Sequence, residues 1–326
     1  MASILDTFCG VAQESTYGTA IASGFRGYEA QSDTFTREVQ YVESVGFRQA
    51  LQTTRFDRHD TISIGASGSI ETDVLNKGHG LLLKHVLGGS SGPTQVGGTA
   101  AYKQTFESSD DGPTGSYTIQ LPRTDSTGSQ QSFTYEGCVP TGFSIDQAID
   151  QALKLTVDFN AENEQQSTSA SSPTYPTSAD PFIYTDAKIE IDGSEISTFT
   201  SFNLTGDLAM DGDRRFLKGS STKLQPARSG VPSYTGTIEG EFTNAQYEAF
   251  RDGTIFSLEL ISTQSTAIAG SNFPFFHVTL PKVKFTGSTP VASIDDLTRI
   301  TLPFTVLWDG SNAAVKIEYQ STDTAF

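Results

Sequence analysis

Four histidines are the first side chains of this sequence to consider for catalysis or metal binding. They are His59, His79, His85 and His277, and none has a second His, Cys or carboxylate at the spacing that puts two metal ligands on one helix face. We therefore interpret His85 as a helix-boundary residue and His277 as a packed or surface ring in a strand. Neither interpretation involves chemistry.

The two cysteines and one serine-containing glycine-rich run are the next candidates for reactive side chains. Cys9 and Cys138 lack metal-site spacing, so we expect two free thiols, and a disulfide between them stays an open alternative. The run 65–69 (Gly-Ala-Ser-Gly-Ser) falls one position short of the nucleophile elbow Gly-x-Ser-x-Gly. It also lies in a predicted strand, whereas an elbow needs a strand-to-helix turn.

Three aspartates, Asp207, Asp211 and Asp213, offer oxygen ligands for a hard cation. Their spacing differs from that of a calcium loop, which has ligands at positions 1, 3 and 5 and a Glu at position 12. A solvated turn explains them more simply, although a bound ion stays open. Because no convergent set of polar side chains is found, we expect no enzymatic activity, no metal and no cofactor.

The chain is acidic, with 38 Asp and Glu against 21 Lys and Arg and a net charge of −17. This balance argues against a protein that grips nucleic acid, because phosphate neutralisation needs clustered basic residues. It fits a surface that nucleic acid slides past, and equally a protein from a host that lives in high salt. No apolar run is long enough to span a membrane, and the N-terminus lacks a signal-peptide pattern, so we expect folding in a cytoplasm without membrane insertion.

A repeated strand pattern organises the sequence. Residues 68–74 (Gly-Ser-Ile-Glu-Thr-Asp-Val) return about half a chain length later as 236–242 (Gly-Thr-Ile-Glu-Gly-Glu-Phe). Each copy alternates polar and apolar residues with the period of a strand, and each precedes a short apolar-periodic helix that ends at Gly. The repeat predicts two tandem copies of one domain, with Glu71 overlying Glu239 and Asp73 overlying Glu241.

The remaining elements follow from alternation and from turn residues. The sequence predicts an arm over 1–30, a first domain over 31–163, a Ser/Thr/Pro-rich linker over 164–182 and a second domain over 183–326. A Gly/Ser/Thr/Pro loop is expected at 88–99. Strands are predicted at 33–43, 61–74, 102–107, 117–121, 131–136, 141–146, 152–160, 182–191, 198–208, 234–243, 254–261, 275–280, 283–285, 298–308 and 314–320. Long basic-rich loops at 44–60 and 211–233 interrupt the two copies at matching places, and loops of this length are usually functional.

Five short sequence words resemble the tail tube proteins of long-tailed viruses of bacteria and archaea. The most specific is 10–19 (Gly-Val-Ala-Gln-Glu-Ser-Thr-Tyr-Gly-Thr), which is similar to an opening common in one such family. The others, in the family's order, are 80–88, 133–138, 280–290 and 302–307. The resemblance covers nearly the whole chain, which departs from the pattern mainly in its acidity and its Ser/Thr-rich linker.

The resemblance implies a mainly β protein made of two tandem copies of a tail-tube-type β-sandwich or barrel domain, each with one flanking short α-helix and a long loop. It implies that inner strands of neighbouring subunits close a barrel around a channel. Because such rings usually hold six tube domains, three fused chains would make a pseudo-sixfold ring, and rings would stack into a tube. Implied partners are other copies of the chain, the tape-measure protein, other tail proteins and viral DNA in transit without specific binding.

This model assigns roles to the polar strand faces and to the basic loops. We expect the polar faces to line a negatively charged channel, with ordinary solvated faces as the alternative. The expected channel-lining residues are Thr36, Glu38, Gln40, Glu71, Asp73, Asn203, Thr205, Asp207, Glu239 and Glu241. The apolar residues expected in the core on the opposite faces are Val39, Tyr41, Ile70, Phe202, Leu204, Ile238 and Phe242. The arginines expected at subunit or ring contacts are Arg48, Arg55, Arg58, Arg214, Arg215 and Arg228.

A different function class remains as an alternative, namely a carbohydrate-binding or adhesive pair of β-sandwiches on a virion or cell surface. Such a protein would favour exposed aromatic residues in loops. The single tryptophan, Trp308, falls in a predicted strand, and the long loops are basic. The sequence therefore favours the structural tail protein, located in the virion tail after assembly in the host cytoplasm.

Overall fold

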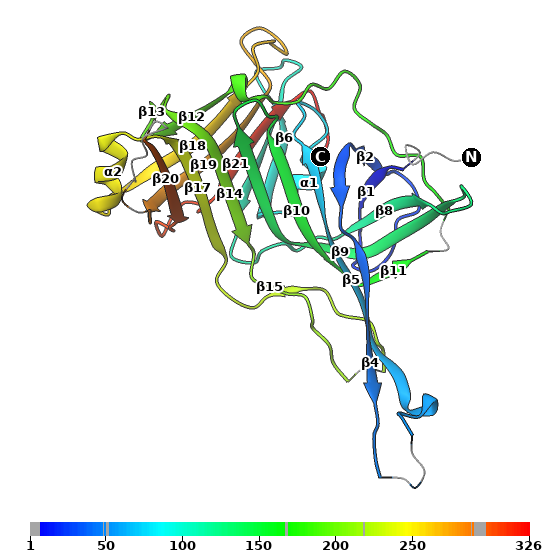
Figure 1. Ribbon diagram of the computed structural model, residues 1–326. Helices are drawn as coiled ribbons and strands as arrows, with labels where there is room; N and C mark the ends of the chain where they lie inside the picture. The colour runs from blue at the N-terminus through cyan, green and yellow to red at the C-terminus, as the bar shows by residue number, and fades with distance from the viewer. Residues whose placement is uncertain are drawn as a thin grey trace.

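Antiparallel β-strands make up most of the regular secondary structure in the computed structural model (Figure 1). The structure describes residues 7–47, 49, 52–166, 169–217, 219–287, 289 and 298–326. Within these residues the only α-helices are α1 (Gly80–Leu83) and α2 (Asn244–Arg251), with short 3-10 turns at Phe56–Arg58 and Tyr184–Asp186. The prediction of a mainly β protein with a short helix after each repeated strand is confirmed.

The first half of the chain forms a connected set of strands. They are β1 (Cys9–Gln13), β2 (Arg26–Tyr28), β3 (Ala30–Asp33), β4 (Thr36–Glu43), β5 (His59–Asp73), β6 (Gly88–Gln95), β7 (Tyr102–Ser108), β8 (Tyr117–Thr124), β9 (Gln130–Ala148), β10 (Lys154–Ala161) and β11 (Asn163–Gln165). The pairing order is β2–β1–β8–β9–β10–β5, and β3 and β4 lie along the other edge of β5.

The second half repeats this pairing order. Its strands are β12 (Ala187–Ile191), β13 (Ser194–Glu195), β14 (Phe199–Asp207), β15 (Met210–Asp211), β16 (Ala227–Arg228), β17 (Ser233–Glu241), β18 (Ile255–Thr263), β19 (Phe275–Phe285), β20 (Arg299–Val306) and β21 (Lys316–Ser321). They pair as β13–β12–β18–β19–β20–β17–β14. Strand β14 runs along β17 where β3 and β4 together run along β5, and each other first-half strand in that order has one counterpart, which is the arrangement that two copies of one unit produce.

The repeated strands occupy matching positions in the sheet. Glu71 of β5 lies opposite Thr156, and Glu239 of β17 lies opposite Thr301. This correspondence supports the predicted duplication, while the exact domain bounds stay a prediction.

The two halves share continuous sheets. Strand β9 of the first half pairs with β14 of the second, and β7 pairs with the C-terminal strand β21. One continuous sheet therefore spans both halves, with its strands in the order β4–β5–β10–β9–β14–β17–β20–β19. The sheet does not close within one chain, because β4 pairs only with β5 among the described residues.

The dry face of this sheet is the core. Ile70, Phe202 and Leu204 are buried, as is Ile238, so the predicted register of β5, β14 and β17 is confirmed. Val39 is half-buried. Buried and exposed residues alternate along these strands. A shift of the register by one residue would bring carboxylates into the core, which is why the register is fixed.

Two residues expected in the core are exposed, and that prediction is wrong for them. Tyr41 is 55 % exposed because the outer part of the β4–β5 hairpin projects beyond the body of the molecule, at the bottom of Figure 1. Its ring stacks instead on His59, with ring centroids 4.7 Å apart. Phe242 is 37 % exposed because it follows the last residue of β17, where its ring contacts Tyr247 of α2.

Several element boundaries also differ from the prediction. Residues 131–136 and 141–146 belong to one strand, β9, and 275–285 form one strand, β19. The expected loop at 88–99 contains β6, which gains its ladder from β7 despite a composition typical of turns. Strand β12 begins at Ala187, later than expected, because the residues before it form a 3-10 turn.

The segment predicted as an arm is part of the sheet, since β1 pairs with both β2 and β8. A buried carboxylate fixes it. Glu14 accepts hydrogen bonds from the backbone N–H groups of Gly18 and Gly137 and from the hydroxyls of Ser116 and Thr118. Gly137 has φ +65°, a conformation that favours glycine. The motifs 10–19 and 133–138 therefore meet at the bond between Glu14 and Gly137.

The described part of the Ser/Thr/Pro-rich segment lies against the first half. The backbone N–H of Thr174 donates to the carbonyl of Phe25, and that of Ser171 donates to the side chain of Gln120. These bonds tie the described residues 169–182 to the first half.

Candidate channel face

A row of polar side chains crosses the sheet from one half to the other. Residues directly opposite each other in antiparallel strands point to the same face. Strand pairing therefore aligns Glu71, Thr156, Ser144, Thr205, Thr235, Thr305 and Lys284 in one row. The row passes the β9–β14 seam without interruption.

The next row along the same face is more strongly charged. It contains Asp73, Lys154, Asp146, Asn203 and Thr237. The amide of Asn203 donates to Asp146 at 2.5 Å across the seam, so a side-chain bond reinforces the backbone ladder there. The ammonium of Lys154 lies 3.0 Å from Oε1 of Glu71, and this hydrogen bond raises the pKa of Lys154.

The register brings all ten expected channel-lining residues to one face of the sheet. Thr36, Glu38 and Gln40 lie opposite residues of β5 that share the side of Glu71. Glu239 and Glu241 lie opposite Thr301 and Arg299 of β20. Whether this face lines a channel is a property of the assembly and stays a prediction.

Sequence reasoning missed half of the face. The additional residues are Ser144, Asp146, Lys154, Thr156, Asp158, Thr235, Thr237, Lys284, Arg299, Thr301 and Thr305. Alternation in the predicted strands 141–146, 152–160 and 298–308 carries the signal for most of them. The missing information was strand order, because only pairing shows that these polar sides continue those of β5 and β14.

The face carries more carboxylates than basic groups. Its acidic members are Glu38, Glu71, Asp73, Asp146, Asp158, Asp207, Glu239 and Glu241, and its basic members on the strands are Lys154, Lys284 and Arg299. Between them lie mainly threonines and serines. The surface is therefore negative, hydroxyl-rich and free of large apolar groups.

One end of the face is covered by the second basic loop. The ammonium of Lys223 lies 3.1 Å from Oε2 of Glu38, whose Oε1 accepts a hydrogen bond from Ser67. The hydrogen bond from Ser67 and the ion pair with Lys223 hold the pKa of Glu38 below its ordinary value. The loop runs beside β5, since Thr222 bridges Ile64, and Gly65 makes room for the Lys223 stem.

The second-half arginines expected at contacts all have partners within the chain. Arg214 donates to the carbonyl of Gln225, and Arg215 pairs with Asp213 and donates to Gln40. Arg228 donates to the carbonyls of residues 109 and 110 in the first half. The bonds from Arg215 to Gln40 and from Arg228 to residues 109 and 110 join the halves of one chain, and contact with a second chain stays a prediction.

The first-half arginines lie on the projecting hairpin. Arg55 pairs with Asp57, two positions away, and Arg58 lies in the 3-10 turn before β5. Arg48 falls outside the described residues. The hairpin thus presents basic groups without any bond to the body of the chain among the described contacts.

The histidines and cysteines of the described part of the chain are mostly buried. No three His, Cys, Asp or Glu side chains there come together as metal ligands. Burial lowers the pKa of His79, His85 and His277 to about 4, which keeps these rings neutral near pH 7. Cys9 and Cys138 are buried free thiols, and burial raises the pKa of Cys9 to about 12.

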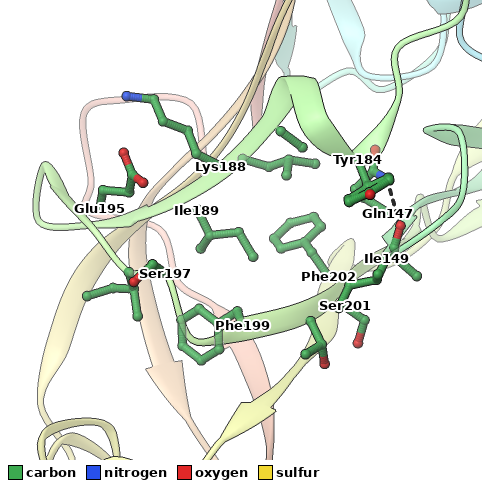
Figure 2. A pocket seen from close by; sticks show the side chains of 15 residues that line it. Gln147, Ile149, Tyr184, Lys188, Ile189, Glu195, Ser197, Phe199, Ser201 and Phe202 are labelled. Carbon is green, nitrogen blue, oxygen red and sulfur yellow. Dashed lines mark hydrogen bonds between the residues drawn. The ribbon is translucent and has the colours of Figure 1, made fainter.

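A hollow of about 260 Å³ lies beside the seam of the two halves. Figure 2 shows Ile189, Phe199 and Phe202 around it, with the charged Lys188 and Glu195 to one side. The lining contains no histidine, cysteine or pair of carboxylates. Among the described helices, none is long and apolar enough to cross a membrane.

The fold combines continuous antiparallel sheets, a polar sheet face that crosses both halves and a projecting hairpin. A family model described as phage tail tube protein matches residues 5–306. The chain therefore belongs to the phage tail tube protein family, whose members are structural components of the virion tail. A comparison with curated proteins finds no match.

Proposed function

We propose that three copies of this chain form a ring with pseudo-sixfold symmetry and that rings stack into the tail tube. The main support for this ring is the row of polar residues that runs without a break from β5 of the first half to β19 of the second. A face shared by two repeated units within one chain is what a ring of such units would repeat. The outer edge of β4, which pairs with no strand among the described residues, supports the same proposal, because an unpaired strand edge is a template for another strand.

Electron microscopy of the purified protein tests this assembly. We expect rings or filaments with a central channel, and a trimer as the smallest ring by native mass spectrometry. A protein that stays monomeric at all concentrations, or rings of six chains, would contradict the proposal.

We further propose that the polar face lines the channel and lets viral DNA pass without adhering. DNA gains no phosphate contacts on a carboxylate-rich wall and releases no counterions there. Electrostatic repulsion extends about 8 Å at physiological ionic strength and about 3 Å at 1 M salt, so the wall acts at close range in strong salt.

Charge reversal on the face tests the channel. The variant Glu71→Lys/Glu239→Lys should assemble into tubes that retain DNA, and the retention should fall steeply with added salt. The control Glu107→Lys/Glu195→Lys makes the same change in net charge on strands β7 and β13, away from the polar face, and should retain no more DNA than the unmodified tube. Equal retention by both variants would place the polar face elsewhere than the channel.

The proposed partners are the tape-measure protein inside the channel, other tail proteins at the tube ends and viral DNA in transit. Assembly would take place in the host cytoplasm, and no step of this function requires a catalytic group.

A second candidate, carbohydrate binding, is favoured by one observation. Trp308 is 67 % exposed and lines a hollow of about 440 Å³ together with Tyr234, Arg228 and Asp110. Aromatic and polar side chains in a hollow are typical of ligand sites. Glycan-array binding that is lost in Trp308→Ala would support this candidate, and binding to no glycan would remove it.

A further inference from the structure

The two halves contain corresponding loop segments in different surroundings. In the first half, Glu43 and His59 form the last strand pair before the long loop. In the second half, Asp211 and Ala227 form the last pair. The loops between these pairs have the same length, so segment 52–58 corresponds to segment 220–226.

This correspondence assigns matching residues on both sides of an observed contact. Arg55 corresponds to Lys223, whose ammonium pairs with Glu38. Glu38 lies opposite Gly65 in the β4–β5 ladder, and Asp207 lies opposite Ser233 in the β14–β17 ladder. Because these ladders are equivalent in the repeat, Asp207 is the counterpart of Glu38.

The surroundings of the two segments differ sharply. The Lys223 side chain is 4 % exposed and Leu224 is half-buried, because segment 220–226 lies on the first half of its own chain. In segment 52–58 the Arg55 side chain is 38 % exposed and Phe56 is 91 % exposed. A segment that is covered in one copy is therefore uncovered in the other, with an aromatic ring in solvent.

We propose that segment 52–58 docks on the second half of a neighbouring chain in the same ring, where Arg55 pairs with Asp207. The occupant of this surface is a second copy of the chain, and the Lys223–Glu38 contact is its internal template. Asp207 is exposed, its Oδ1 accepts only a backbone bond from Ala209, and no Lys or Arg pairs with it among the described residues. The inference rests on the proposed ring.

Two local features fit this pairing. Thr235 stands where Ser67 stands in the template, so a hydroxyl is again available beside the carboxylate. Ser233 stands where Gly65 stands in the template, so less space is left for the aliphatic part of a basic side chain. Arginine suits this position because its guanidinium group lies further from the backbone than the ammonium group of lysine does. The present Arg55–Asp57 pair is on the surface and costs little to exchange.

A charge-swap experiment tests the contact in the full chain. Arg55→Glu and Asp207→Arg each place like charges together, and each should raise the protein concentration needed for tube assembly by roughly tenfold or more. The double variant Arg55→Glu/Asp207→Arg should restore assembly to near the wild-type concentration. The matched control is Arg58→Glu/Asp207→Arg, which reverses a neighbouring arginine and should not restore it.

Cross-linking locates the partner. The chain has no exposed cysteine among its described residues. In Arg55→Cys/Asp207→Cys tubes, a short thiol-specific cross-linker should produce a ladder that ends at three chains, as expected for closure within a ring. The template pair Glu38→Cys/Lys223→Cys should react within single chains and give no ladder.

The outcomes separate the two proposals. If the wild-type protein forms no rings, the proposed function and this inference fail together. If tubes form but single charge reversals assemble normally, or if the ladder extends beyond three chains because the hairpin reaches an adjacent ring, only this inference is overturned.

Discussion

The ammonium nitrogen of Lys223 lies 3.1 Å from Oε2 of Glu38, and this ion pair joins residues 185 positions apart in the two halves of the chain. The Lys223 side chain is nearly buried, whereas the Glu38 side chain keeps access to solvent. The pair therefore anchors the second basic loop on the polar face of the first half.

Removal of this lysine should loosen the loop. We expect Lys223→Met to lower the free energy of unfolding by about 1–2 kcal/mol, because Glu38 loses a charge-assisted hydrogen bond. Proteolytic cleavage within 212–226 should accelerate. The control Lys188→Met removes the Lys188–Glu190 pair, whose lysine side chain is 44 % exposed, and should cost less than about 1 kcal/mol. Equal effects of the two substitutions would contradict the anchoring role.

Glu14 should be essential for the N-terminal segment. Its buried carboxylate accepts four hydrogen bonds, and Glu14→Gln replaces one accepting oxygen by a donor that faces other donors. We expect a loss of about 2–4 kcal/mol in unfolding free energy and earlier proteolysis before β3. Glu29→Gln changes an exposed carboxylate nearby and should have little effect; a small effect of both would mean that the carboxylate does not hold this segment.

The seam between the halves depends on a glycine. A Cβ atom at Gly206 would lie 2.3 Å from Cε1 of Phe143, which is buried on the partner strand. Gly206→Ala should therefore destabilise the protein by about 1–3 kcal/mol through overpacking. At Gly230 the nearest atom to a new Cβ is 3.6 Å away, so Gly230→Ala is the matched control. Denaturant unfolding of both variants measures the difference, and equal stability would show that the seam can repack freely.

Stability should fall as the pH drops from 7 toward 4. Burial lowers the pKa of His79, His85 and His277 to about 4, whereas a histidine in the unfolded chain titrates near 6.5. The unfolded state binds more protons in this window, so falling pH favours it. At pH 5, His85→Phe should recover about 1–2 kcal/mol of the loss that wild type suffers relative to pH 8. The same pH dependence in both proteins would exclude His85 as a contributor.

Much of the fold was predictable because alternation and the repeat are local signals. The strand containing Glu71 and its copy containing Glu239, together with the helices after them, lie where the periodicity indicates. Strand β6 was missed because Gly, Ser, Thr and Pro have low intrinsic strand preference, and only its pairing with β7 makes it a strand.

The polar face was predictable in part for the same reason. The side-chain direction within a strand follows from period two, which is why the ten expected residues share one face. The order of strands depends on contacts between distant segments, so the contribution of β9, β10 and β20 was not visible. Tyr41 shows that alternation alone does not predict burial. It continues the apolar side of its strand, but it lies on the projecting part of the hairpin, where no core covers it.

The seam between β9 and β14 limits the number of repeated halves that a ring can contain. Because the covalent chain holds the two halves together, their effective concentration is high and this seam forms during folding, before any subunit meets another. A ring made from such chains can contain only an even number of halves. Three interfaces between chains would close a ring of six halves. The three seams that alternate with them lie within single chains, so dilution of the protein would not separate them.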